Sequence, residues 1–274
     1  MILLKAFNKV VLEIIKLIYP PDTQKIVQAK IHGFDILVLA NEDVGRSIAV
    51  FHRYEKRDSD LLKSIIKDGD VCIDAGANVG FYTLLMAKST PNGVVHAFEP
   101  MPLNWHLLNA SLHLNGIKNV CLNNRALGKE RGESSFSASV DGAYSSMVNV
   151  GRKKEAEQLI VAVETIDDYM SEYNIDQIDI MKVDVEGAEG LVLTGAKKLF
   201  LCDKKPRLVL LELFDENFKF YDTSISNICR TMEAYGYSAH VRLKNGLITP
   251  YKERHYNNYY NVFFVLDIAI LKSH

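Results

Sequence analysis

From residue 60 onwards the chain alternates short apolar runs with amphipathic stretches, separated by glycine and polar residues. Short apolar runs between turn signals predict buried strands, and longer periodic stretches predict helices. We expect strands at 71–75, 94–98, 120–124, 178–183, 208–213, 237–242 and 261–267, the last antiparallel, and helices at 81–88, 103–115 and 188–200. Two further β-runs, 134–137 and 159–163, lie between the third and fourth strands. Strands that alternate with helices pair in parallel through right-handed crossovers, which predicts an α/β, Rossmann-like sheet with helices on both faces.

The segment before residue 60 has a different pattern. Residues 24–40 form two β-runs around His32 and Gly33 and predict a hairpin, whereas 43–57 is mixed and is expected to be irregular. Residues 1–19 are apolar, but Lys5, Lys9, Glu13 and Lys16 recur on one helical face. We therefore predict an N-terminal extension, residues 1–59, with an amphipathic helix and a hairpin, followed by one domain over 60–274.

The polar stripe of residues 1–19 argues against a membrane-spanning helix, and no small-residue cleavage site for a signal peptide follows. Two alternatives remain open for this helix. Its apolar face packs on the main domain or on a second copy in a homodimer, or it lies in a membrane surface as a peripheral contact.

Composition excludes several classes of protein. With 48% hydrophobic and 24% charged residues among 274, the chain is neither disordered nor collagen-like. A net charge of −2 provides no basic face for nucleic acid. The four cysteines form no C-x-x-C pair, so neither a disulfide framework nor a zinc site is indicated, and a cytoplasmic location fits best.

Candidate chemistry begins at the end of the first strand of the predicted domain, in the sequence VCIDAGANVGFY (71–82). Gly76 and Gly80 flank a tight turn, but Asn78 replaces the middle glycine of a dinucleotide-binding G-x-G-x-x-G motif. Asp74 precedes the turn, where its carboxylate would repel a pyrophosphate and attract a cation. The sulfonium and ammonium groups of S-adenosylmethionine therefore suit this turn better than NAD does.

The next two strands end with further candidates for the cofactor site. Glu99 follows the second strand, where a carboxylate can accept hydrogen bonds from both ribose hydroxyls of a nucleoside. Ala126, after the third strand, is a small apolar residue that can pack on an adenine ring, although a plain turn is an equal alternative.

Four motifs together carry a family resemblance. DAGANVGFYT (74–83), FEPMPLN (98–104), KVDVEGAE (182–189) and LLEL (210–213) are similar to the FkbM family of S-adenosylmethionine-dependent O-methyltransferases. The resemblance covers residues 54–213 and implies a class I methyltransferase fold. It implies cofactor contacts from Asp74, Gly76, Asn78, Gly80, Glu99, Pro100 and Asn104, with Glu55 and the pair Ser145 and Ser146 near the cofactor's amino-acid end. Ala188 stands where many relatives have histidine, which argues against a histidine base there.

The acidic residues after the fourth and fifth strands are candidates for catalysis. Lys182 and Asp184 are expected to share a face, with Glu186 and Glu212 nearby. A hydroxyl must lose its proton as it attacks a methyl group, and Asp184 or Glu186 can act as the base. Alternatively, Asp184, Glu186 and Glu212 can hold a divalent cation, although we do not predict a metal. Glu186 and Glu189 can instead favour the start of the next helix.

The predicted function is transfer of a methyl group from S-adenosylmethionine to a hydroxyl of a small molecule, and the predicted acceptor is a sugar or glycan precursor. Aromatic and amide side chains in 251–261 suit such an acceptor, and His255 there is an alternative base. Two other functions are weighed against it: an NAD-binding oxidoreductase, and a Rossmann-like scaffold without catalytic activity.

Overall fold

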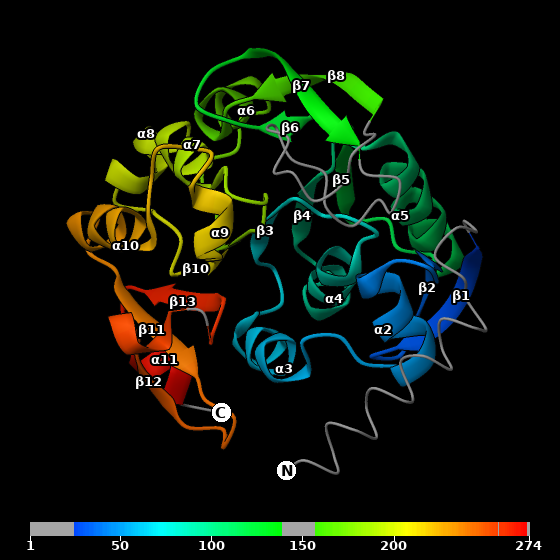
Figure 1. Ribbon diagram of the computed structural model, residues 1–274, viewed down its shortest axis with the longest axis horizontal. Helices are drawn as coiled ribbons and strands as arrows, with labels where there is room; N and C mark the ends of the chain where they lie inside the picture. The colour runs from blue at the N-terminus through cyan, green and yellow to red at the C-terminus, as the bar shows by residue number, and fades with distance from the viewer. Residues whose placement is uncertain (1–24, 139–156, 257, 273–274) are drawn as a thin grey trace.

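The computed structural model describes residues 25–138, 157–256 and 258–272. Its main sheet has eight strands in the order β12-β11-β13-β10-β9-β3-β4-β5 (Figure 1). These are β3 (Val71–Ala75), β4 (Val94–Phe98), β5 (Val120–Asn123), β9 (Ile180–Val183), β10 (Leu208–Glu212), β11 (Ser238–Arg242), β12 (Ile248–Pro250) and β13 (Asn261–Val265). The five strands from β10 to β5 are parallel, and β13 runs antiparallel between β10 and β11.

This strand order confirms the predicted fold. Numbered along the main domain, the strands run 3-2-1-4-5-7-6, which is the Rossmann-like arrangement of class I methyltransferases, with the order reversing at β3 and β9. The difference from seven expected strands is β12, a short edge strand that pairs only with β11 among the described residues.

Helices cover both faces of the sheet because successive strand residues point to opposite sides. One hydrophobic cluster contains Cys72, Val95 and Leu210, and the other contains their neighbours on the strands, such as Ile73 and Leu211. The first cluster is covered by α2 (Asp43–Phe51), α3 (Lys56–Ile65), α4 (Phe81–Ser89), α5 (Pro102–Leu114) and α11 (Ala269–Lys272). The second is covered by α6 (Ile166–Glu172), α7 (Glu189–Thr194), α8 (Lys197–Leu201), α9 (Asp215–Phe218) and α10 (Ile225–Ala234).

The predicted hairpin is present as β1 (Ile26–Ile31) and β2 (Phe34–Leu39), which turn at His32 and Gly33. Its buried side chains, including Phe34 and Ile36, belong to the same cluster as α4 and α5. The N-terminal helix expected at residues 1–19 lies outside the described residues, and the boundary at residue 60 stays a prediction.

The expectation that 43–57 is irregular is wrong, because α2 and the start of α3 occupy this segment. Helix α2 packs closely on β2, and a Cβ atom at Gly45 would lie 2.0 Å from the carbonyl oxygen of Leu39. A glycine that lowers helix propensity is therefore required here by packing, and this concealed the helix in the sequence. The helix expected at 188–200 is divided into α7 and α8 at Gly195 and Ala196.

A smaller three-stranded sheet lies beside the main one, where β6 (Ala126–Leu127) and β7 (Gly132–Ala138) flank β8 (Glu157–Glu164) (Figure 1). It contains the two extra β-runs expected from the sequence. Ala126 and Phe136 form a small apolar cluster with Val161. This sheet therefore supplies an apolar wall close to the ends of the central strands.

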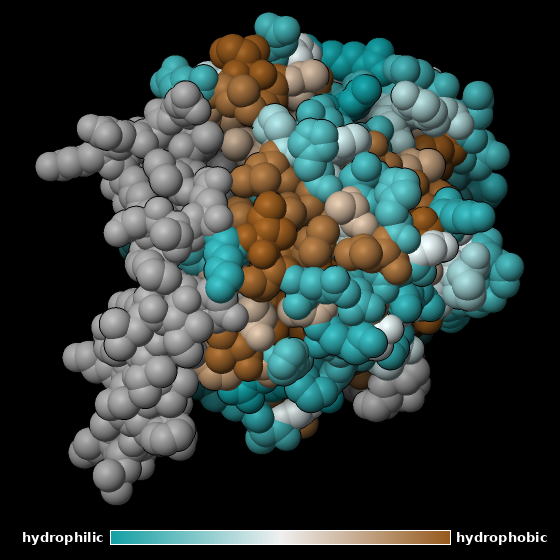
Figure 2. Space-filling view, turned by 90° about the vertical axis from the view of Figure 1, so that its right-hand side faces the viewer, coloured by the Kyte–Doolittle hydropathy of each residue, from teal (hydrophilic) through white to brown (hydrophobic). Residues whose placement is uncertain are grey.

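The surface that carries α5 and β1 shows hydrophobic residues gathered near its middle (Figure 2). Ile26, Leu103 and Leu114 are large exposed apolar residues of these elements. No helix of residues 25–138, 157–256 and 258–272 is long and apolar enough to cross a membrane. The predicted homodimer and the peripheral membrane contact both stay predictions.

Candidate active site

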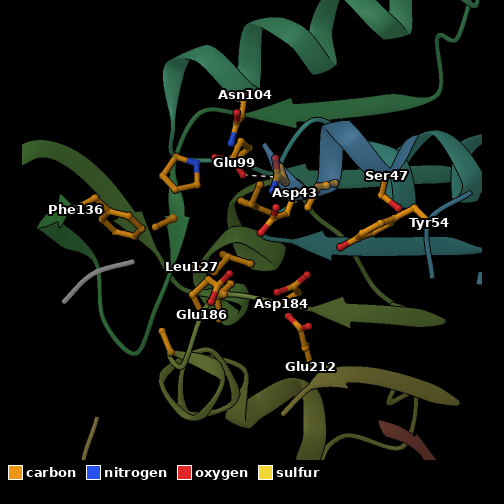
Figure 3. A pocket seen from close by; sticks show the side chains of 18 residues that line it. Asp43, Ser47, Tyr54, Glu99, Asn104, Leu127, Phe136, Asp184, Glu186 and Glu212 are labelled. Atoms are coloured by element: carbon orange, nitrogen blue, oxygen red, sulfur yellow. Dashed lines mark hydrogen bonds between the residues drawn. The ribbon is translucent and has the colours of Figure 1, made fainter. Parts of the chain in front are cut away.

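A cavity of about 340 Å³ opens at the carboxyl ends of β3, β4, β9 and β10 (Figure 3). This is the edge at which open α/β sheets bind ligands, close to the point where strand order reverses. Helix α2, β6 and β7 complete its walls. Of the residues predicted for the site, those that line this cavity are Gly76, Asn78, Glu99, Pro100, Asn104, Ala126, Asp184, Glu186 and Glu212.

The turn after β3 is fixed by backbone contacts. Gly76 has φ of +78°, and a Cβ atom there would lie 1.8 Å from the carbonyl oxygen of Asp184, so only glycine fits this turn. Asn78 is also left-handed, with φ of +50°. The backbone N–H of Asn78 donates a hydrogen bond to Glu99 Oε2 at 2.8 Å, and this bond joins the turn to the end of β4.

The Glu99 carboxylate is buried, with 4% of its surface exposed, yet it lines the cavity. Oε1 accepts a hydrogen bond from the amide of Met101 at 2.9 Å, and Oε2 accepts the one from Asn78. Burial raises the pKa of Glu99 to about 7, against the opposing effect of these two amides. Each carboxylate oxygen can accept a second hydrogen bond, so the pair of oxygens is positioned to receive two hydroxyl donors.

Helix α2 brings a second acidic group to Glu99. Burial, and then the negative charge of Glu99, raises the pKa of Glu42 to about 8. Asp43 follows it at the start of the helix and lies beside Glu99 in the cavity (Figure 3). This part of the cavity is therefore acidic, which disfavours a phosphate and favours neutral hydroxyl donors or a cation.

Another part of the cavity lining is apolar. Phe98 and Pro100 at the end of β4, Ala126 and Leu127 of β6, and Phe136 of β7 all line it. Such a wall suits the face of a flat heterocyclic ring. The cavity therefore pairs a hydroxyl-binding carboxylate with an apolar slot, which is the combination that an adenosine group requires.

A pair of carboxyl groups faces the cavity where β9 and β10 end. The side chains of Asp184 and Glu212 point towards each other (Figure 3) and share a hydrogen bond. The charge of Asp184, and then burial, raises the pKa of Glu212 well above its usual value. Burial alone would raise the pKa of Asp184, but the charge of Lys182 and the hydrogen bonds from Glu212 and Lys182 lower it overall. The pKa values of the two groups are thus shifted in opposite directions, which favours Asp184 as the ionised member of the pair.

Lys182 lies beneath this pair on the same face of β9, as the sequence predicted. Its Nζ atom is 3.0 Å from Asp184 Oδ2, 4.0 Å from Asp74 Oδ1 and 4.8 Å from the centre of the Tyr82 ring. Burial would lower the pKa of Lys182, but the charges of Asp184, Asp74 and Glu55 raise it overall. The ammonium group thus stays charged although it is almost entirely buried.

Asp74 does not line the cavity. It is fully buried, pairs with Lys182 across β3 and β9, and its Oδ2 atom accepts a hydrogen bond from Thr83 Oγ1 at 2.6 Å. Burial raises its pKa, although Lys182 and Thr83 oppose the shift. The structure therefore places Asp74 under the site as the partner of Lys182, and its predicted contact with the cofactor stays a prediction.

Three other predicted residues lie away from the cavity wall or outside the described residues. Glu55 is half-buried, does not line this cavity, and accepts a hydrogen bond from the Tyr82 hydroxyl at 2.6 Å. Gly80 begins α4 and packs on Leu108. Ser146 and its neighbour Ser145 fall outside the described residues.

The acidic residues after β9 divide into two roles. Glu186 has φ of +54°, lines the cavity and accepts a hydrogen bond from Asn217 Nδ2 at 2.7 Å. Glu189 is buried and accepts hydrogen bonds from the amides of Val185 and Gly187, and burial raises its pKa to about 8. Glu189 therefore stabilises the turn that leads into α7 through the two hydrogen bonds that it accepts.

His255, the alternative base, does not line the cavity either. It is buried between Tyr251 and Tyr259, and its Nδ1 atom accepts a hydrogen bond from the amide of Lys252 at 3.0 Å. Its ring thus orders the turn before β13 and does not face the Asp184–Glu212 pair.

Sequence reasoning missed the wall that α2 and its neighbours provide. Asp43, Ser47, Tyr54 and Phe136 line the cavity and were not among the predicted site residues. The apolar spacing of Val44, Ile48 and Phe51 was a signal for α2. Its position over the cavity depends on packing against β2, which no local pattern reveals. Among the described residues, no group of three or more His, Cys, Asp or Glu side chains is arranged to hold a metal ion, so the divalent-cation alternative finds no support there.

The sequence profile of the methyltransferase FkbM domain matches residues 74–239, well over half of the chain. The chain belongs to the FkbM methyltransferase family. It is therefore an S-adenosylmethionine-dependent methyltransferase, and the NAD-binding oxidoreductase weighed as an alternative is wrong.

Curated relatives of this FkbM-family chain agree. It is 26% identical over 181 residues to Methyltransferase 1 of Beauveria bassiana, covering 59% of this chain and 72% of the relative. It is 26% identical over 159 residues to the 31-O-demethyl-FK506 methyltransferase FkbM of Streptomyces tacrolimicus, covering 48% of this chain and 61% of that relative.

The solved structures that match this chain are less similar to it in sequence than the curated relatives are. The precorrin-6y C5,15-methyltransferase of Geobacter metallireducens matches with a TM-score of 0.44 and 13% identity, covering 77% of this chain and 87% of that one. An S-adenosylmethionine-dependent O-methyltransferase of Thermotoga maritima matches with a TM-score of 0.43 and 13% identity, covering 88% and 77%. The fold assignment rests on the strand order described above.

Proposed function

We propose that the chain transfers the methyl group of S-adenosylmethionine to a hydroxyl oxygen of a small molecule, and that the acceptor is a sugar or glycan precursor. The observation that carries this proposal is the Asp184 carboxylate, 3.0 Å from the Lys182 ammonium group, at the edge of a cavity whose other part suits adenosine. The cofactor supplies a methyl group on a positively charged sulfur, which becomes neutral when the methyl group leaves.

In this proposal the residues of the cavity hold the cofactor in two parts. Glu99 accepts hydrogen bonds from the ribose hydroxyls with the lone pairs that the amides of Asn78 and Met101 leave free. Pro100, Ala126 and Phe136 contact the faces of the adenine ring. Asn104 lies above Glu99, where its amide can reach the same nucleoside (Figure 3).

Asp184 takes the proton of the acceptor hydroxyl in this proposal. Its carboxylate is held by Lys182 on one side and by Glu212 on the other, so its lowered pKa makes it a weak base. A weak base suffices, because the hydroxyl becomes strongly acidic as its oxygen forms the bond to carbon. Lys182 and Glu212 fix the orientation of Asp184 and keep it ionised, which makes them positioning residues.

The hydroxyl as acceptor group is supported by two features. Asp184 is an oxygen base at the cavity wall, and a relative from Streptomyces tacrolimicus carries a name that describes methylation at an oxygen. The sugar as acceptor is supported by aromatic and amide residues such as Tyr259 and Asn258, which lie in the turn before β13.

The experiment is a transfer assay with methyl-labelled S-adenosylmethionine against a panel of neutral sugars, sugar phosphates, uronic acids and hydroxylated polyketides. Mass spectrometry and NMR of the products identify the methylated atom. We expect a methyl ether on a sugar of the panel. A product methylated at nitrogen, carbon or sulfur would exclude the hydroxyl, and a methyl ether formed only on polyketides would exclude the sugar.

A further inference from the structure

A second and larger cavity, of about 720 Å³, lies next to the candidate active site. Its walls are the start of α3, the hairpin between β11 and β12, and the turn before β13. None of the residues that line it also lines the first cavity. A ligand bound here would therefore contact a separate set of side chains.

The second cavity carries an excess of cationic side chains. Five line it: Arg53, Lys56, Arg57, Arg242 and Lys244. Lys56 forms an ion pair with Asp60 at 2.7 Å. Within the part of the chain that the structure describes, the other four form no ion pair with a carboxylate. Arg57 and Arg242 also interact electrostatically with Asp58, but the cations of this cavity outnumber its carboxyl groups.

Three carboxyl groups, Glu55, Asp58 and Asp60, line this cavity against five cations. Asp58 and Glu55 are half-buried in its wall, and burial raises the pKa of Asp58 to about 6. Burial also raises the pKa of Glu55, against the hydrogen bond from Tyr82. Arg242 donates through Nη1 to the carbonyl oxygen of Arg57 at 2.8 Å, which ties β11 to α3 and fixes the guanidinium group at the cavity.

The two cavities are lined by residues that are neighbours in the chain or across paired strands. Tyr54 lines the first cavity, and Glu55, the next residue, lines the second. On the other side, Glu212 lines the first cavity, and its partner across β10 and β13, Asn261, lines the second. A molecule bound among the cations thus lies close to the Asp184–Glu212 pair.

We propose that the second cavity binds the anionic group, a phosphate or a carboxylate, of a hydroxyl-bearing acceptor and so directs the acceptor hydroxyl towards Asp184. Guanidinium groups recognise both anions through paired hydrogen bonds. The amides of Asn245 and Asn258 provide donors and acceptors for the other hydroxyls of a sugar. This inference rests on the proposed function and adds to it that the acceptor is an acidic sugar.

The test measures binding by NMR titration of the full chain with S-adenosylhomocysteine present. The probes are glucose 6-phosphate, glucuronic acid and glucose. We expect both acidic probes to bind more tightly than glucose, with chemical-shift changes at Arg242 and Asn258. The tighter of the two acidic probes distinguishes a phosphate from a carboxylate as the preferred anion.

Two variants and a control sharpen this test. The double substitution R57Q/K244Q removes two exposed cations, and R242K keeps the charge but loses the paired hydrogen bonds. One hydrogen bond to a charged group corresponds to about tenfold in affinity. We therefore expect R57Q/K244Q to lower the affinity for the acidic probes by about tenfold or more and to leave the affinity for glucose unchanged. R230Q, on the exposed part of α10, is the matched control and should change neither the affinity for the acidic probes nor that for glucose.

The outcomes separate this inference from the proposed function. If glucose binds as tightly as the acidic probes, or if R57Q/K244Q leaves their affinity unchanged, the second cavity is not an anion site. A methyl ether formed on a neutral acceptor would then leave the proposed function intact. If the acidic probes bind as expected but no hydroxyl is methylated, the anion site stands and the proposed function fails.

Discussion

The ammonium group of Lys182 lies 3.0 Å from the carboxylate of Asp184, and both residues belong to the segment that leads from β9 to the cavity. The same ammonium group is 4.0 Å from the fully buried Asp74 on β3. One cation thus interacts with Asp74, buried under the cavity, and with Asp184, which lines it. The charge state of the candidate base is therefore tied to the core of the sheet.

We expect Asp184→Asn to lower kcat by roughly 10²–10⁴-fold, the usual range for the loss of a positioned general base. Binding of S-adenosylhomocysteine should persist, because Asp184 does not contact the ribose or adenine in the proposed arrangement. Calorimetry and single-turnover kinetics measure the two effects separately. Asp176→Asn, an exposed position before β9, is the matched control. Wild-type turnover in Asp184→Asn would remove this residue from catalysis.

Lys182→Met should strongly destabilise the fold, because it leaves the buried Asp74 without its cation. Removing one partner of a buried ion pair costs about 3–5 kcal/mol of the free energy of unfolding. Urea unfolding of Lys182→Met, Asp74→Asn and the double variant gives the coupling between the two sites. We expect the double variant to lose less stability than the sum of the single losses, and simple additivity would contradict this pairing.

The affinity for S-adenosylhomocysteine should rise with pH around neutrality. The pKa of Glu99 is about 7, and only its ionised form accepts hydrogen bonds from both ribose hydroxyls with both oxygens. Affinity should therefore be about tenfold lower at one pH unit below this pKa than well above it. Titration calorimetry between pH 6 and 8 tests this.

Glu99→Gln provides the control for that pH dependence. The amide side chain does not ionise, so its affinity should be low and nearly constant over the same interval. If the pH dependence persisted in Glu99→Gln, it would come from another group, and Glu42, whose pKa is raised to about 8, would be the next to replace.

The raised pKa of Glu189 predicts that the stability of the fold depends on pH, without an effect of this group on cofactor binding. Its pKa is about 8 in the folded chain and 4.5 as a free side chain, so the folded state holds the proton more tightly. Stability from this group is thus complete at low pH and is lost as pH rises through the folded value. Glu189→Gln should be more stable relative to wild type at pH 8 than at pH 6, as measured by thermal unfolding. An equal difference at both values would show that Glu189 is ionised in the folded chain.

Treatment with excess EDTA should leave methyl transfer unchanged. In the described part of the chain no acidic or histidine cluster is arranged to hold a metal, and Lys182 already supplies a positive charge to Asp184. Activity with EDTA, and after adding back Mg²⁺, measures this. A loss that Mg²⁺ restores would show that a divalent ion takes part.

Most of the main sheet was predictable because each strand has its own apolar run and its own turn. The runs that became β3, β4 and β10 are continuous, as expected for strands buried on both faces. Helices α6 and α10 were missed, although the side chains of Thr165 and Ser224 cap them with hydrogen bonds from Asp168 and Asn227. The capping residues are visible in the sequence, but polar residues dominate these short helices, so the apolar periodicity that indicates a helix is weak.

The candidate site was predictable in position but only partly in detail. Parallel strands bring their carboxyl ends to one edge, which is why Glu99, Asp184 and Glu212 meet there. The direction of Asp74 was not predictable, because it depends on Lys182, which lies more than a hundred positions further along the chain. The contribution of α2 was concealed for a similar reason, since Gly45 is explained only by the strand that it packs against.

The contact between Gly76 and the carbonyl oxygen of Asp184 has a consequence for how this enzyme can change. The turn at Gly76 and the residue Asp184 pack against each other through their main chains, so a shift of one would displace the other. New acceptors are therefore more easily accommodated by altering α2, the β11–β12 hairpin or the turn before β13, which border the two cavities from outside this contact. Directed evolution towards other substrates should accumulate its changes in those three segments and leave Gly76 untouched.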